Sequence, residues 1–265
     1  CIYWRSPRFW IFEKIKKNNG VQMLDLKGKW VLVTGSSRGV GAEIAKAVAS
    51  LGGNLFLQSR SKSHAEKTLK AVQEMGVEAI ALECALENPD SIKAMLQEID
   101  NSGKIVDLVF NNAGLQVPYC SDYFSNERKA SLEAYAVNCL APVQIAYHFL
   151  PKMVKNGFGR ILMTSSGIAD QPELMGYACA KAALDKFVRD FACKLNGTDV
   201  MMNLMDPGWL RTDLGGPNAP NDVTTVIPGA LVGVLAEDKK SGRWFSAQEF
   251  AGMELSLAVQ KAETL

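Results

Sequence analysis

The sequence has no long hydrophobic run, little histidine and no paired cysteine motif, and each absence excludes a class of protein. No apolar segment approaches the roughly 20 residues that a membrane-spanning helix needs. The six cysteines, at positions 1, 84, 120, 139, 179 and 193, form no C-x-x-C pair, and the only histidines are His64 and His148. We therefore expect neither a metal site nor a disulfide framework, and reduced thiols in the cytoplasm fit this cysteine usage better.

The chain also lacks an excess of charge of either sign. Its 29 Lys+Arg against 28 Asp+Glu leave a net charge of +1 over 265 residues, so no strongly basic face is expected for nucleic acid. A hydrophobic content of 48% with 22% charged residues is typical of a soluble globular protein. A single α/β domain can reach about 250 residues, so one large domain is allowed.

Residues 1–22 differ in composition from the rest of the chain. They carry five basic residues against one acidic residue, together with five aromatic residues. Without a long apolar stretch or a small-residue cleavage site, the segment does not have the pattern of a signal peptide. We expect an extension outside the fold, followed by one domain over residues 23–265. The alternative is an arm that touches a membrane surface or a neighbouring subunit.

Short apolar runs alternate with helical patterns from residue 30 onward. Strands are expected at 30–34, 55–58, 78–83, 105–110, 160–164 and 200–205, and helices at 41–51, 65–75, 89–99, 132–154 and 176–195. Nearly all-apolar strands that alternate with helices indicate a parallel sheet covered on both faces. The sequence therefore predicts a single doubly wound, Rossmann-type α/β domain with a mostly parallel sheet.

A glycine-rich turn follows the first expected strand and precedes a helix. Its G-x-x-x-G-x-G spacing lets the backbone turn tightly, while the helix N-terminus favours an anion such as a pyrophosphate. The alternative is a plain glycine-rich loop, but the strand-turn-helix context favours a dinucleotide. The residues expected to hold the cofactor here are Gly35, Ser37, Arg38, Gly39, Val40 and Gly41.

The end of the second strand bears on the choice between NAD and NADP. An acidic residue ordinarily holds the ribose 2′-hydroxyl of NAD at this place, but the chain has Ser59 and Arg60 instead. Together with Arg38 they offer hydrogen bonds and positive charge suited to a 2′-phosphate, which favours NADP(H) over NAD(H). The alternative is that Arg60 is only a solvated loop residue.

Three further motifs follow in order. Asn111-Asn112-Ala113-Gly114 ends an expected strand, Tyr177 and Lys181 are four residues apart, and Pro207-Gly208 precedes Thr212. With the T-G-x-x-x-G-x-G turn, residues 25–212 resemble the classical short-chain dehydrogenase/reductase (SDR) family. The resemblance implies an NAD(P)-dependent oxidoreductase. It also implies that the cofactor contacts Asn112, Ala113, Gly114, Tyr177, Lys181, Pro207, Gly208 and Thr212.

The pair Tyr177 and Lys181 points to acid/base chemistry. Four residues apart on a helix, the two side chains share one face. A lysine ammonium beside a phenol is expected to lower the phenol pKa from about 10 toward neutrality, which makes a usable general acid/base. Tyr177 is therefore the expected acid/base residue, and Lys181 the residue that activates it. The family resemblance implies that Lys181 also anchors the ribose.

By the same resemblance, Ser166 and Asn138 complete the catalytic set. The Ser166 hydroxyl would donate to the reacting carbonyl oxygen as negative charge develops there. Ser165 is the rival by adjacency, because the 11 residues from Ser166 to Tyr177 are slightly fewer than usual in the family. Asn138 matches the helix asparagine that supports a proton relay with the lysine; the alternative is an ordinary polar residue inside a helix.

Two departures from the family pattern stand out. Ala85 occupies the place of a common aspartate that contacts adenine, so adenine recognition is expected to rely on backbone or apolar packing. Residues 242–247 stand where the family has a strand that ends in Gly-Gly. They still have the pattern of a last strand, and an atypical tail follows at 250–265.

Taken together, the motifs predict an NADP(H)-preferring oxidoreductase that acts on carbonyl or secondary alcohol groups. The alternative is a sensor or regulator that binds NADP(H) on the same fold without turnover. The helices at 132–154 and 176–195 resemble those used for subunit contacts in the family, which implies a homodimer or homotetramer. The substrate is expected to lie among loops 116–124, 168–175 and 209–223, whose few fixed charges favour an apolar carbonyl compound.

The remaining candidates are expected to be structural. His64 and His148 lie away from the glycine motif, and the Cys179 side chain should point off the face that Tyr177 and Lys181 share.

Overall fold

The computed structural model describes residues 23–125 and 128–265, so the expectations for residues 1–22 lie outside the described residues. In the described chain, one seven-stranded sheet has the order β3-β2-β1-β4-β5-β6-β7, and its neighbouring strands are parallel. This confirms the expected Rossmann-type α/β fold. The strands span Trp30–Val33 (β1), Asn54–Ser59 (β2), Ala79–Glu83 (β3), Val106–Asn111 (β4), Gly159–Thr164 (β5), Val200–Asp206 (β6) and Trp244–Ser246 (β7).

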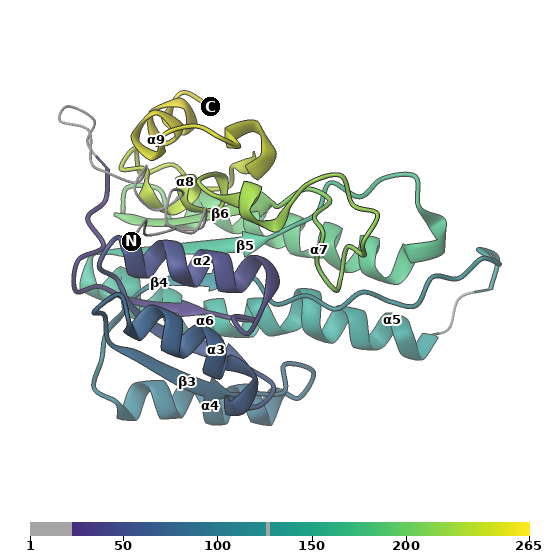
Figure 1. The fold of residues 1–265 in the computed structure, drawn as a ribbon, viewed down its shortest axis with the longest axis horizontal. Coiled ribbons are helices and arrows are strands. Elements are labelled where there is room, and N and C mark those ends of the chain that lie inside the picture. Colours follow the sequence, from purple (N-terminus) through teal and green to yellow (C-terminus); the bar gives the residue numbers. More distant parts are fainter. Residues whose placement is uncertain (1–22, 126–127) are drawn as a thin grey trace, which may run out of the picture.

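Helices cover both faces of the sheet (Figure 1). One apolar cluster joins α2, α3, α8 and α9 to the sheet, and a second joins α4, α6 and α7 to its other face. The helices span Gly39–Ser50 (α2), Lys62–Gln73 (α3), Pro89–Asn101 (α4), Arg128–Tyr135 (α5), Ala141–Asn156 (α6), Met175–Phe191 (α7), Gly229–Leu235 (α8) and Leu255–Glu263 (α9).

Strand β1 shows why this sequence takes a central place in the sheet. Val31 and Val33 pack into the first cluster, whereas Trp30 and Leu32 pack into the second. Successive side chains of a strand point to opposite faces, so an all-apolar strand is stable only where both faces are covered.

The helix expected at 132–154 is not continuous. A π-helical segment, Ala136–Leu140, separates α5 from α6. Such wide turns are rare and concentrate at functional sites. The described C-terminal part ends in the short strand β7 and helix α9, which packs through Leu255, Ala258 and Val259 into the first cluster.

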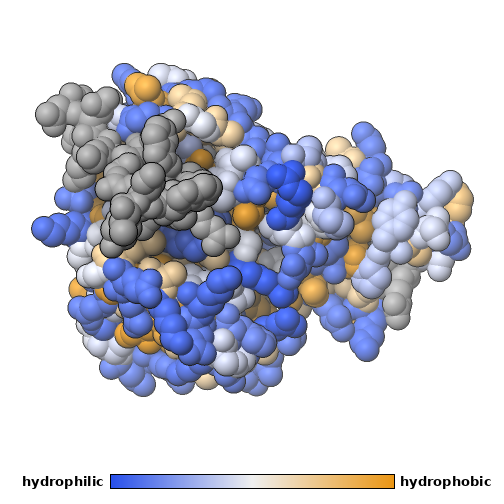
Figure 2. Space-filling model, viewed as in Figure 1, coloured by the Kyte–Doolittle hydropathy of each residue, from blue (hydrophilic) through white to orange (hydrophobic). Residues whose placement is uncertain are grey.

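Helix α5, the start of α7 and the segments that follow β4 and β6 extend past the carboxyl ends of the strands (Figure 1). Ligands of doubly wound sheets bind at this edge. The face seen in Figure 2 is largely hydrophilic, with apolar side chains scattered over it. Among the described residues, no helix combines the length and the apolar character needed to cross a bilayer.

Candidate active site

The glycine turn between β1 and α2 depends on the absence of side chains. Gly35 and Gly39 have φ angles of +64° and +58°, which glycine adopts without steric cost. At Gly41, a Cβ atom would lie 2.3 Å from the Gly35 carbonyl oxygen and 2.6 Å from Nδ2 of Asn112. The turn therefore closes more tightly than a residue with a side chain would allow.

Two side chains outside the glycine motif hold the turn in place. The Thr34 hydroxyl accepts the backbone N–H groups of Asn112 and Ala113, each at 3.0 Å. The Gln58 side chain accepts the N–H of Gly35 at 2.9 Å and donates to the main chain just after β3 at 2.8 Å. These bonds join β1 to its neighbour β2 and to the segment after β4. Gln58 was not predicted, because a glutamine at a strand end carries no distinctive sequence signal.

The N-terminus of α2 suits a phosphate. Its N-cap residue, Arg38, makes no side-chain hydrogen bond to the first turn, so the N–H groups and the dipole of that turn can act on an anion. The Arg38 guanidinium pairs with Asp213 at 2.8 Å, and both side chains are largely exposed. Since an exposed ion pair contributes at most about 1 kcal/mol, Arg38 can exchange this partner for a phosphate at little cost.

At the end of β2, the Arg60 side chain is accessible to a ligand, whereas the Ser59 side chain is not. Arg60 is exposed, whereas Ser59 is buried and its hydroxyl donates to the Ser61 carbonyl at 2.6 Å. At the next strand end, the Ala85 N–H donates to the Ser91 hydroxyl at 3.0 Å. Because the N–H of Ala85 already donates to Ser91, this residue can contact an adenine through apolar packing of its methyl group.

Helix α7 and the end of β5 carry most of the side chains that are expected to be catalytic. Lys181 is 3% exposed, and its Nζ donates to the Thr164 carbonyl at 2.7 Å. Tyr177 lies one helical turn before it and is 8% exposed. Positions four residues apart share a helix face, so Asp185, four residues after Lys181, lies on the same face as the tyrosine and the lysine. The row on α7 consists of Tyr177, Lys181 and Asp185.

The two candidate serines have different partners. The Ser165 hydroxyl donates to Oδ1 of Asp185 at 2.5 Å, and the residue is 1% exposed. Ser166 is partly exposed, its hydroxyl accepts the Ile168 N–H at 3.2 Å, and it acts on the Tyr177 phenol by lowering the pKa of that group. The geometry therefore favours Ser166 over Ser165 as the serine that can act together with the phenol.

The expected lowering of the Tyr177 pKa is wrong for this structure. Burial raises the pKa of Tyr177 despite the opposing hydrogen bond with Ser166, and the charge of Asp206 raises it further. The Lys181 amine is directed to Thr164 and lies 5.8 Å from the centre of the tyrosine ring. Burial lowers the pKa of Lys181 itself to about 8. The phenol is therefore protonated at neutral pH, the form that donates a proton.

Asn138 lies in the π-helical segment and is fully buried. Its Nδ2 donates to the Leu115 carbonyl at 2.8 Å, and its Oδ1 accepts the Leu115 N–H at 3.0 Å. The amide thus fixes the segment after β4 at the point where it passes Lys181: a Cβ atom on Gly114 would lie 3.3 Å from the Asn138 Oδ1 and 4.0 Å from the lysine Nζ. This contact gives a reason for a buried asparagine inside a helix.

The segment after β6 meets the glycine turn. Gly208 has a φ of +77°, and its N–H donates to Oδ1 of Asp206 at 3.1 Å. The methyl group of Thr212 would lie 3.5 Å from a Cβ atom on Gly39. The fold thereby brings Pro207, Gly208 and Thr212 to the same edge of the sheet as the glycine motif.

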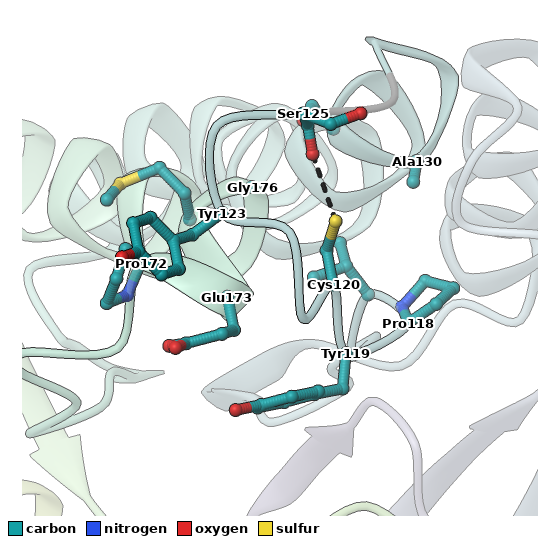
Figure 3. A pocket seen from close by; sticks show the side chains of 12 residues that line it. Pro118, Tyr119, Cys120, Tyr123, Ser125, Ala130, Pro172, Glu173 and Gly176 are labelled. Atoms are coloured by element: carbon teal, nitrogen blue, oxygen red, sulfur yellow. Dashed lines mark hydrogen bonds between the residues drawn. The ribbon is translucent and has the colours of Figure 1, made fainter.

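A pocket of about 270 Å³ adjoins the start of α7 (Figure 3). Its walls come from segment 117–125, the start of α5 and turn 172–176, and the Cys120 N–H donates to the Glu173 carbonyl at 3.2 Å. The Cys120 thiol donates to the Ser125 carbonyl at 2.9 Å. Two of the three loops expected around the substrate thus meet here, whereas loop 209–223 is not part of this lining.

Two carboxylates at the site were missed by the sequence analysis. Asp185 pairs with Ser165, and Asp206 lies close to Tyr177 and Gly167; a Cβ atom on the latter would lie 2.9 Å from the Asp206 Oδ2. The available signals were the four-residue spacing of Asp185 from Lys181 and the place of Asp206 directly before Pro-Gly. Neither spacing alone distinguishes a site residue from a solvated one.

Comparisons with known proteins agree with this geometry. Residues 29–222 match the family model described as short chain dehydrogenase. The chain is 31% identical over 227 residues to ketoacyl reductase HetN of Nostoc sp. (79% of this chain, 77% of the relative). It is 29% identical to the 3-oxoacyl-[acyl-carrier-protein] reductase FabG of Aquifex aeolicus (90% of this chain, 93% of the relative).

Among solved structures, a metagenomic short-chain oxidoreductase in complex with NADP is similar. It has 28% sequence identity and a TM-score of 0.65, with 70% of this chain and 84% of that chain covered. The family match, the sheet order and the glycine turn all agree. The chain therefore belongs to the short-chain dehydrogenase family and is an oxidoreductase with an NAD(P)-binding Rossmann fold.

Proposed function

We propose that this protein is an NADP(H)-preferring reductase that transfers hydride between a nicotinamide and a carbonyl or secondary alcohol, with Tyr177 as general acid/base. The observation that carries the proposal is the placement of a protonated, buried phenol beside Ser166 at the sheet edge that also holds the glycine turn. The names of two similar proteins, a ketoacyl reductase and a 3-oxoacyl reductase, support a carbonyl substrate.

The side chains divide the work of this reaction. The nicotinamide, when bound, supplies or accepts the hydride. The Ser166 hydroxyl donates to the carbonyl oxygen and orients it. The Tyr177 phenol gives its proton to that oxygen, and the Lys181 ammonium stabilises the phenolate left behind. Asn138 keeps the segment after β4 in place beside the lysine.

The dinucleotide would be held at the glycine turn and the neighbouring strand ends. The uncapped first turn of α2 fits a pyrophosphate, and the absence of room for a Cβ atom at Gly41 fits close approach of backbone to ligand. The exposed Arg60 and the weakly paired Arg38 supply the charge for a 2′-phosphate. The remaining contacts are assigned to Ser37, Val40, Ser59, Asn112, Ala113, Gly114, Pro207, Gly208 and Thr212.

Replacing Arg60 by alanine is expected to weaken NADPH binding by about 10–100-fold, because a charge-assisted hydrogen bond contributes about 1.5–3 kcal/mol. The dissociation constant for NADH should change little, since NADH has no 2′-phosphate. Fluorescence titration with both nucleotides measures the two constants. Lys62→Ala is the matched control: it removes an exposed cation two residues away that pairs with Glu98. An unchanged NADPH/NADH ratio in the Arg60 variant would exclude a role for Arg60 in cofactor choice.

The proposed activity is tested by titrating the purified protein with NADPH and NADH, then adding a panel of aldehydes, ketones and quinones. Oxidation of bound NADPH by any member supports the reductase. Tight binding without turnover across the panel would favour the sensor instead, and no binding of either nucleotide would contradict both.

We also propose a cytoplasmic homodimer or homotetramer. Large apolar side chains are exposed along α5, the π-helical segment and α6, namely Leu132, Leu140, Tyr147 and Val154. The described cysteines, at 84, 120, 139, 179 and 193, are free thiols, which suits a reducing compartment. Light scattering coupled to size-exclusion chromatography measures the assembly directly.

A further inference from the structure

Asp185 is a third titratable group in line with Tyr177 and Lys181, and the proposed mechanism gives it no role. It lies one helical turn beyond Lys181 on the same face of α7. Its Oδ1 accepts the hydroxyl of Ser165 at 2.5 Å, and the Ser165 N–H donates to the Met205 carbonyl of β6 at 2.8 Å. The carboxylate is therefore anchored where β5, β6 and α7 meet.

The end of β5 and the row on α7 are paired residue by residue. The Thr164 carbonyl accepts a hydrogen bond from the Lys181 ammonium, and the hydroxyl of the next residue, Ser165, donates a hydrogen bond to Asp185. The residue after that, Ser166, acts on the phenol and lowers its pKa. Asp185 thus belongs to the same set of contacts as the proposed catalytic side chains, and it is held by Ser165 in the segment directly after β5 that also carries Ser166.

The charges around the Lys181 amine make Asp185 important. Burial lowers the pKa of Lys181 to about 8, and the Asp185 charge is the largest effect that opposes it. The Cys139 thiol of the π-helical segment also faces the amine, but burial raises the pKa of Cys139, so this thiol is neutral near pH 7. The remaining neighbour, the Thr164 carbonyl, supplies a dipole and no charge.

Four groups act on Asp185 itself. Burial raises the pKa of this carboxyl, while the hydrogen bond from Ser165 and the charges of Arg189 and Lys181 favour its ionised form. Asp206, from the end of β6, opposes them as a like charge. Ser165, directly after β5, and the two cations of α7 thus support a carboxylate that lies partly buried behind the catalytic centre.

We propose that Asp185 is a positioning residue of this centre: anchored by Ser165, it keeps Lys181 protonated beside Tyr177. The inference rests on the proposed function, in which the lysine ammonium stabilises the phenolate. Without the Asp185 charge, the amine would lose its proton at a lower pH, and catalysis would fall on the alkaline side while the acid side stayed unchanged.

The test compares Asp185→Asn with Ser165→Ala in the full chain. Asparagine keeps an oxygen that can accept from Ser165 but removes the charge, whereas the serine variant removes the hydrogen bond and keeps the charge. In protein with ¹³Cε-labelled lysine, the Lys181 resonance is assigned by its loss in Lys181→Met. We expect the midpoint of its titration to fall by about one pH unit in Asp185→Asn, because the substitution removes the opposite charge one helical turn away. In Ser165→Ala we expect a much smaller shift.

The activity profile provides the second readout. The alkaline limb of kcat against pH should move down with the lysine midpoint in Asp185→Asn and stay in place in Ser165→Ala. An unchanged Lys181 midpoint in Asp185→Asn would overturn the proposal. A shifted midpoint in a protein that reduces no carbonyl would retain the electrostatic coupling and refute the proposed function instead.

If Asp185→Asn does not fold, the wild-type protein still decides the question. Its Lys181 resonance should show a second inflection at acid pH, where Asp185 takes up a proton, and Asp185→Glu should preserve the alkaline midpoint. A single inflection in the wild type would contradict the coupling.

Discussion

Replacing Tyr177 by phenylalanine is expected to lower kcat for carbonyl reduction by about 10²–10⁴-fold, the usual contribution of a general acid. The substitution removes one hydroxyl and leaves a ring that fills the same buried space beside Lys181. The dissociation constant for NADPH should stay nearly the same, because the glycine turn and the strand ends are untouched. Steady-state kinetics and fluorescence titration measure the two quantities separately.

Tyr135→Phe is the matched control for this variant. Tyr135 ends α5, and its hydroxyl interacts with Cys179, which lies on α7 between Tyr177 and Lys181. The same chemical change there should leave kcat within about twofold of the wild type, because the proposed mechanism gives the Tyr135 hydroxyl no proton to transfer. Full activity in Tyr177→Phe, or a comparable loss in Tyr135→Phe, would remove Tyr177 from its assigned role.

Replacing Gly41 by alanine is expected to abolish NADPH binding and to lower the free energy of unfolding by about 3 kcal/mol. The added Cβ atom would lie 2.3 Å from the Gly35 carbonyl oxygen and 2.6 Å from the Asn112 side chain. The first neighbour is backbone held by Gln58, so it cannot move aside without opening the turn. Urea unfolding and nucleotide titration measure the two losses.

Gly76→Ala is the control in which a glycine is replaced without a steric clash. Gly76 has a φ of +87°, and no atom lies within 4 Å of the place that an added Cβ atom would take, so alanine there meets backbone strain alone. A left-handed conformation costs a non-glycine residue about 1–2 kcal/mol, and NADPH binding should persist. If the Gly41 variant behaved like this control, the tight closure of the turn would not be needed for the cofactor.

The spacing of glycines was enough to predict the turn, because each glycine meets a local steric need that the sequence displays. The side chains that hold the turn were not predictable in the same way. Gln58 and Thr34 act through partners in the segments that follow other strands, 23 to 79 residues away along the chain. These residues come together in space only when the sheet has formed.

The catalytic row shows a second limit. The four-residue spacing predicted that Tyr177 and Lys181 share a face, and they do. Their protonation depends on how deeply the fold buries them. Burial is the largest influence on the pKa of each, so the expected direction for the tyrosine pKa was wrong. Asp185 has the same spacing from Lys181, yet only the contact with Ser165 distinguishes it from a solvent-facing carboxylate.

Hydrophobic periodicity predicted one helix over 132–154 because both halves have apolar stripes. The structure interrupts it at Ala136–Leu140, where Asn138 turns inward to bind Leu115. A pattern read in steps of 3.6 residues takes no account of such a long-range hydrogen bond.

The π-helical segment also limits how the length of this part of the chain can change. Each residue of an α-helix advances the chain by about 100° around the helix axis. The number of residues in the wide turn therefore sets the angle between the apolar face of α5 and the apolar face of α6. In this way α5 buries Ala134 while α6 turns Ile145 and Phe149 into the core. A one-residue deletion in this segment would leave α5 and α6 helical, but it would rotate the apolar face of one of them away from the core. Insertions and deletions should therefore be far less tolerated at 136–140 than in the surface loops.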